Sequence, residues 1–166
     1  YLHFMKDKSN VGKNYWLHMI GTPEYAAWSG YSFETVCLHH IEQIVNALGI
    51  SGIFYSPCSW VYRPSEAILN DIDADEDMKI GGQIDLLIDR NDKTVSICEM
   101  KYASGEYEIT KAYSRHVEQR HRTFRKVTST KKSFSIVYVT PFGLQNNMYA
   151  RKVNKQITAD DLFKKV

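Results

Sequence analysis

This sequence of 166 residues has no long hydrophobic run, so we expect no membrane-spanning segment and no membrane partner. It also has no internal repeat and no low-complexity linker, which favours a single domain. Cysteine is scarce: Cys37, Cys58 and Cys98 are odd in number and show no CxxC spacing. We therefore expect reduced, buried thiols in a cytoplasmic protein rather than a disulfide framework.

The composition is that of a folded protein. A hydrophobic share of 43% and a charged share of 24% are ordinary for a soluble domain, and an aromatic share of 13% argues against disorder. We expect one domain, with residues 1–31 as an aromatic-rich lead-in and residues 32–166 as the core. Because the sequence opens on Tyr1 rather than Met, we expect it to be an excised part of a longer protein.

Opposite charges are segregated along the chain, although the net charge is only +2. Residues 71–92 contain eight acidic and two basic residues, a balance of −6. Residues 111–132 contain eight basic residues and one acidic residue, a balance of +7. An acidic cluster beside a basic helix suits a metal site that acts on a phosphodiester. A basic run taken alone is more often a solvated helix face.

Hydrophobic periodicity predicts the element order α-β-β-β-α-β-α. Helices are expected at residues 32–48 (Ser32 as N-cap and Gly49 as stop), at 108–127 and from Thr158 onward. Strands are expected at residues 52–55, 82–89, 94–101 and 133–140, and a polar, solvated or partly mobile loop at 62–80. This order predicts an α/β or α+β fold with a mixed central sheet flanked by helices.

Ionisable residues stand among aliphatic residues in the strands 82–89 and 94–101. Asp85, Glu99 and Lys101 occupy positions where an apolar strand pair is expected. Unpaired charges are costly at such positions, so a sequence that keeps three of them is expected to use them. A divalent metal ion is the most direct use.

The segment 89–94 is polar and turn-prone and predicts an antiparallel hairpin between these two strands. In the resulting register Asp85 faces Glu99, with Cβ atoms roughly 5 Å apart, and Gln83 faces Lys101. Two carboxylates at that separation repel unless a cation lies between them, and Mg²⁺ or Mn²⁺ prefers such oxygen ligands. A slip of one residue would place the two acids on opposite faces of the sheet.

Glu34 on the first helix, Asp85 on one strand and Glu99-Met100-Lys101 on the next resemble the motif of the PD-(D/E)xK nuclease superfamily, which has a restriction endonuclease-like core. Over roughly residues 28–165 the chain is more closely similar to the C-terminal domain of a family of prokaryotic AAA-type ATPases. That similarity is carried by three strings: Gly30-Tyr31-Ser32-Phe33-Glu34, Gln83 to Arg90, and Cys98-Glu99-Met100-Lys101. Two features depart from the pattern. Ile84 stands where a proline often precedes the aspartate, and a GxxxxGK[ST] loop is missing.

The resemblance implies that Asp85, Glu99 and Glu34 are ligands of Mg²⁺ or Mn²⁺. It implies that Lys101 polarises the attacking water and offsets charge on the phosphate, and that Gln83 holds the water or the lysine. DNA and an ATPase domain of the same longer chain are the implied partners, and many such nucleases are homodimers. The candidates for DNA contact lie on the basic helix: Lys111, Tyr113, Arg115 and Arg122.

Simpler interpretations of the same residues remain open. Glu99 and Lys101 could form a surface ion pair on an edge strand, and Tyr113 equally fits the hydrophobic core. Two functions follow from the sequence. The first is metal-dependent cleavage of DNA. The second is a nuclease-like fold retained as a nucleic-acid-binding or regulatory module of an attached ATPase.

Overall fold

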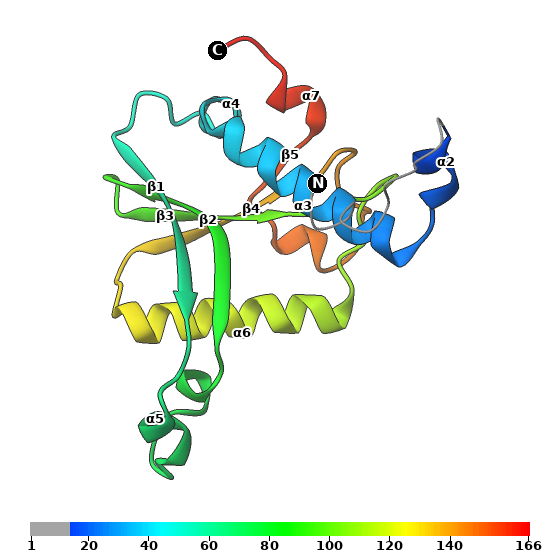
Figure 1. Cartoon of the computed structure of the whole chain (residues 1–166). Helices are drawn as coiled ribbons and strands as arrows, with labels where there is room; N and C mark the ends of the chain where they lie inside the picture. The colour runs from blue at the N-terminus through cyan, green and yellow to red at the C-terminus, as the bar shows by residue number, and fades with distance from the viewer. Residues whose placement is uncertain (1–13) are drawn as a thin grey trace.

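A mixed five-stranded sheet forms the centre of the computed structural model, which describes residues 14–166 (Figure 1). The strands lie side by side in chain order, and β1–β2 and β2–β3 are antiparallel whereas β3–β4 and β4–β5 are parallel. The expected mixed sheet is therefore confirmed, and β5, with only three residues, is an addition. The strands are β1 Tyr55–Tyr62, β2 Gly82–Arg90, β3 Thr94–Met100, β4 Ser133–Val139 and β5 Lys155–Ile157.

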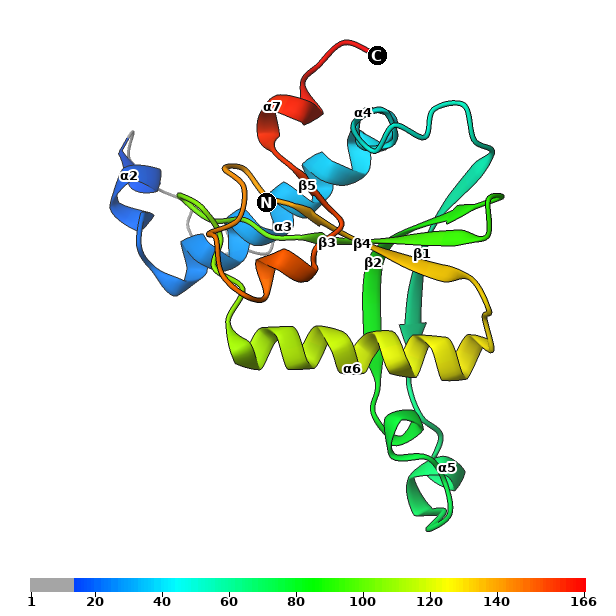
Figure 2. The same ribbon diagram turned by 180° about the vertical axis from the view of Figure 1, so that it is seen from behind.

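Helices flank both faces of this sheet. Helices α3, α4 and α7 lie on one face, and α6 runs along the other (Figures 1 and 2). Helix α6 is also the crossover between the parallel strands β3 and β4, a connection that parallel pairing requires. The helices are α2 Tyr15–Met19, α3 Pro23–His39, α4 Ile41–Ala47, α5 Glu66–Asn70, α6 Lys111–Thr128 and α7 Ala159–Leu162, with 3₁₀ turns η1 Glu76–Lys79 and η2 Ala150–Lys152.

The first helix of the core differs from its expected bounds. Thr22 caps α3 and Pro23 lies in its first turn, so the helix begins well before Ser32. The helix also ends at His39, and α4 follows as a separate element. The predicted stop at Gly49 is confirmed, with φ of +71°. Residues 14–31 of the expected aromatic lead-in are largely helical, and its residues 1–13 lie outside the described part of the chain.

Strand β1 replaces the short strand expected at residues 52–55. It begins at Tyr55 and runs through Pro57, which a central strand would not tolerate. Strand β1 is the edge of the sheet, so the missing N–H of the proline breaks no ladder. The other three expected strands correspond to β2, β3 and β4.

The segment that joins β1 to β2 contains two short helices, and most of its residues are exposed, in agreement with the expected solvated segment. We call residues 63–81 the arm, which contains α5 and η1 and projects beyond α6 (Figure 1). Ser65 caps α5 by accepting a hydrogen bond from the backbone of Ile68. The hydroxyl of Thr123 on α6 donates to the carbonyl of Asp77 at 2.7 Å. The base of the arm therefore rests on α6.

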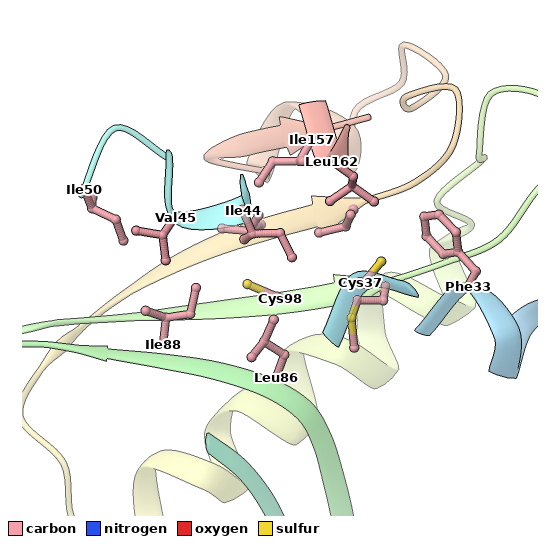
Figure 3. Packing of buried hydrophobic residues seen from close by; sticks show 13 residues of the cluster. Phe33, Cys37, Ile44, Val45, Ile50, Leu86, Ile88, Cys98, Ile157 and Leu162 are labelled. Atoms are coloured by element: carbon pink, nitrogen blue, oxygen red, sulfur yellow. The ribbon is translucent and has the colours of Figure 1, made fainter. Parts of the chain in front are cut away.

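The main hydrophobic core lies between the sheet and helices α3, α4 and α7 (Figure 3). Leu86 and Ile88 of β2 point into it, as does Cys98 of β3. Burying a Leu or Ile side chain stabilises the fold by about 1.5–3 kcal/mol. A second cluster on the opposite face packs Ile97 of β3 against Phe124 of α6. The sheet is therefore anchored from both sides.

All three cysteines are free, but only Cys37 and Cys98 are buried, so the expectation of burial is wrong for Cys58, which lies on the exposed edge strand. Burial raises the pKa of Cys37 to about 12, which makes that thiol unreactive. Among residues 14–166, no helix combines the length and the apolar character that crossing a bilayer requires.

Candidate functional site

The strands β2 and β3 separate at the predicted acidic positions. The expected hairpin register is confirmed from Asp89–Val95 to Leu86–Cys98. Pairing ends there, because β2 turns away from β3 and continues beside β1 toward the arm (Figure 1). The expected opposite pairs are therefore not formed: Asp85–Glu99 and Gln83–Lys101.

A β-bulge marks the place where β2 turns. Two residues of β2, Asp85 and Leu86, stand opposite the single residue Ser59 of β1. Ile84 and Leu87 consequently pack in the same cluster against α6, although they are three positions apart. Strict alternation would place them on opposite faces. The bulge therefore slips the side-chain pattern of β2 by one residue between Ile84 and Leu87.

Glu34, Asp85 and Lys101 come together from three separate elements. Glu34 is half-buried on α3, Asp85 lies at the bulge of β2, and Lys101 directly follows β3. Burial and the charge of Asp85 raise the pKa of Glu34, and Lys101 lowers it in part. These side chains therefore share one electrostatic neighbourhood, as the sequence predicts.

Gln83 belongs to the same neighbourhood. Its side-chain amide donates a hydrogen bond to Asp85 Oδ1 at 2.5 Å. The two residues lie two apart on β2 and therefore project to the same side of the strand. Gln83 thus orients the carboxylate of Asp85.

Glu99 instead faces α6. It is buried, with 5% of its surface exposed. Tyr113 donates a hydrogen bond to its carboxylate at 2.9 Å, and Arg120 forms an ion pair with it. The ring nitrogen Nε2 of His121 lies 3.9 Å from the same carboxylate. Glu99 is thus not a surface residue paired with Lys101, and all these partners come from one helix.

The charges around Glu99 are unusual for a buried site. Burial opposes the charge of Arg120, yet Glu99 more than offsets this, so the pKa of Arg120 is raised. Burial lowers the pKa of His121 to about 4 despite the nearby Glu99. At neutral pH the cluster therefore contains a neutral imidazole beside one anion and one cation. Lys101 completes the cluster, with Nζ 5.5 Å from the centre of the Tyr113 ring.

The position of Arg120 on α6 is itself a sign that this side chain is paired. Tyr113, Val117 and Phe124 form the apolar face of α6, and Arg120 lies on that same face. A charged residue on a buried helix face requires a partner of opposite charge. The periodicity thus identifies Arg120 as buried and paired, although it cannot name Glu99 as the partner.

The acidic and basic segments of the chain pair with each other across the arm and α6. Lys126 contacts Asp75 at 2.5 Å and Asp77 at 2.8 Å, and Arg122 contacts Asp77 at 3.3 Å. Of the predicted DNA contacts, Arg122 is therefore engaged within the fold and Tyr113 contacts Glu99. Lys111 and Arg115 are exposed on α6 and make no ion pair with any described residue.

The carboxylates near the bulge of β2 are the groups that could hold a metal ion. Within residues 14–166, no three His, Cys, Asp or Glu side chains are grouped so that they could hold a metal ion. Glu34 and Asp85 are neighbours, whereas Glu99 is held by Arg120 and Tyr113. As the side chains lie, the predicted set of three acidic ligands is incomplete.

Comparisons with known proteins add no assignment, since no family model, no curated protein and no solved structure matches this chain. The class that the structure itself defines is an α/β domain with a mixed five-stranded sheet and a polar cluster where two of its strands separate.

Proposed function

We propose that this domain hydrolyses phosphodiester bonds in DNA with the help of Mg²⁺ or Mn²⁺, through a site of the PD-(D/E)xK type. The observation that supports this most is the meeting of Glu34, Asp85 and Lys101, from three different elements, beside the bulge of β2. The elements α3, β1, β2, β3, α6 and β4, with β4 parallel to β3, also follow one another in the order predicted from the sequence, although α4 and α5 are inserted.

The roles of the residues follow from their chemistry. Asp85 and Glu34 would hold the metal ion, with Glu99 as a third ligand once it leaves Arg120. Such an ion would supply an activated water molecule and stabilise charge on the phosphate. Lys101 offers a positive charge to the same phosphate, and Gln83 fixes the carboxylate of Asp85.

The DNA would approach along the first half of α6. Lys111 and Arg115 are exposed there, whereas the second half carries side chains paired with the arm. Free lysine and arginine side chains are the groups that neutralise phosphates. A cytoplasmic location, an attached ATPase domain in a longer chain and a homodimer belong to the same proposal.

One observation favours a second function, a catalytically silent nucleic-acid-binding or regulatory module of that ATPase. The charge of Glu99 is already neutralised by Arg120 and its carboxylate is already hydrogen bonded by Tyr113. A carboxylate so satisfied needs no metal ion.

Nicking of supercoiled plasmid separates the two functions. Under the first, the protein nicks DNA with Mn²⁺ or Mg²⁺ but not with EDTA. Asp85→Asn should lower the rate by at least the roughly 100-fold that disturbed metal shells cost. Asp89→Asn is the matched control, because Asp89 lies on the same strand but pairs with Lys132. DNA binding without any metal-dependent nicking would favour the second function.

A further inference from the structure

The side chain of Arg120 is largely buried at the candidate site, unlike the side chain of a surface arginine. Its guanidinium group forms an ion pair with the carboxylate of Glu99, and only 13% of its side chain is exposed. Its Nε is fully buried and has no hydrogen-bond partner among the described residues. A buried donor without a partner is costly, so the position of this side chain is maintained by its other contacts.

Gly82 provides the space that Arg120 occupies. A methyl group at Gly82 would lie 3.1 Å from Cγ of Arg120 and 3.1 Å from a ring carbon of Trp60. The stem of Arg120 therefore crosses the backbone of β2 directly before Gln83 and Asp85. Arg120 reaches from α6, past the strand that carries Asp85, to the strand that carries Glu99.

We propose that Arg120 is a positioning residue that holds Glu99 in a metal-free arrangement, and that a divalent cation must displace this arginine to gain Glu99 as a ligand. This inference depends on the proposed metal site. A buried carboxylate needs one positive partner, because an unpaired buried charge is strongly destabilising. Arg120 and a divalent cation therefore compete for the same anion.

A purely structural ion pair is the other interpretation of this contact. Both interpretations predict that Arg120→Gln destabilises the protein, since either leaves Glu99 without its cation. They differ in the response to metal. Only under the proposed competition does loss of Arg120 make the protein bind a divalent cation more tightly.

The test is calorimetric titration of Mn²⁺ into the purified protein and its variants. Arg120→Gln should bind Mn²⁺ at least about tenfold more tightly than the parent. A tenfold gain corresponds to only a part of the free energy that is lost when a buried ion pair is broken. Arg125→Gln is the matched control, because Arg125 lies on the same helix, contacts Phe134 and should not change the affinity. Adding Asp85→Asn to Arg120→Gln should abolish the gain.

A second variant covers the case in which Arg120→Gln does not fold. Gly82→Ala keeps the charge of Arg120 but crowds its stem, and it should also tighten Mn²⁺ binding. Equal or weaker binding in the folded variants, or a gain that survives Asp85→Asn, would overturn the competition between Arg120 and the metal.

Plasmid nicking by the parent protein decides the proposed function separately. Metal-dependent nicking with unchanged affinity in Arg120→Gln rejects only the role of Arg120, whereas tighter Mn²⁺ binding without nicking rejects only the nuclease.

Discussion

The phenolic oxygen of Tyr113 donates a hydrogen bond to Glu99 at 2.9 Å, joining the first turn of α6 to the end of β3. Burial and the negative charge of Glu99 raise the pKa of Tyr113, so the hydroxyl keeps its proton and remains a donor. A residue that the sequence offers as a DNA contact is therefore part of the support of a buried carboxylate.

Removing this hydrogen bond should destabilise the protein measurably. Hydrogen bonds to charged groups contribute about 1.5–3 kcal/mol, so Tyr113→Phe should lower the free energy of unfolding in urea by about that amount. In a Glu99→Gln background the same substitution should cost less, because the acceptor is no longer charged. Equal costs in both backgrounds would show that Tyr113 does not stabilise the Glu99 carboxylate.

His121 makes stability depend on pH. Burial lowers its pKa to about 4, below the ordinary value of 6.5. As pH falls from 6.5 toward 4, His121 takes up a proton in the unfolded chain but not in the folded chain. The folded state therefore loses stability over this range, by up to roughly 3 kcal/mol in total. His121→Gln should remove this loss when unfolding is measured across the window. The exposed His116, on the same helix, is the control, and His116→Gln should keep it.

Glu34 should oppose folding at neutral pH. Its pKa is raised by burial and Asp85, so the folded chain binds a proton more readily than the unfolded chain. Stability is therefore lost as pH rises above about 4.5, and Glu34→Gln should stabilise the metal-free protein at pH 7 by less than about 1 kcal/mol, since the site is half open to solvent. Below pH 4 the two proteins should unfold alike. Glu24→Gln, at the exposed start of α3, should give no stabilisation.

The arm should limit DNA binding by α6. Asp75 and Asp77 pair with Lys126 and Arg122, and these bases become free when both acids are replaced by asparagine. Each base that then contacts a phosphate steepens the salt dependence of affinity by about 0.9. Fluorescence anisotropy with a DNA duplex should therefore show tighter binding and a salt slope steeper by up to about 2 for the double variant. Asp71→Asn removes an arm carboxylate that, within residues 14–166, bonds only the nearby backbone of Asp73, and it should leave the slope unchanged. An unaltered slope in the double variant would mean that α6 does not contact DNA there.

The identity of β2 and β3 and their hairpin register could be predicted because they depend on local information. Aliphatic alternation and the polar turn before Thr94 predict β2 and β3 and their register near the turn. The bulge at Asp85 and Leu86 could not be predicted in this way. It arises from the pairing of β2 with β1, and the irregular sequence of β1 around Pro57 conceals that partner.

The candidate site shows the same division between local and non-local information. The motif letters predict that Glu34, Asp85 and Lys101 meet, and the charges around Glu34 agree. The partner of Glu99 lies 21 positions away on α6 and depends on how that helix packs against the sheet. Likewise, the charge segregation of the sequence suggests a binding surface for DNA, but much of it is neutralised between the arm and α6.

Anomalous diffraction from crystals soaked in Mn²⁺ would test the central claim most directly. The account predicts one strong peak between the carboxylates of Asp85 and Glu34, with Glu99 turned from Arg120 toward the ion and Lys101 beside it. A peak at the acids of the arm instead, or no peak while Glu99 stays paired with Arg120, would contradict a metal-dependent site and leave the silent module as the function.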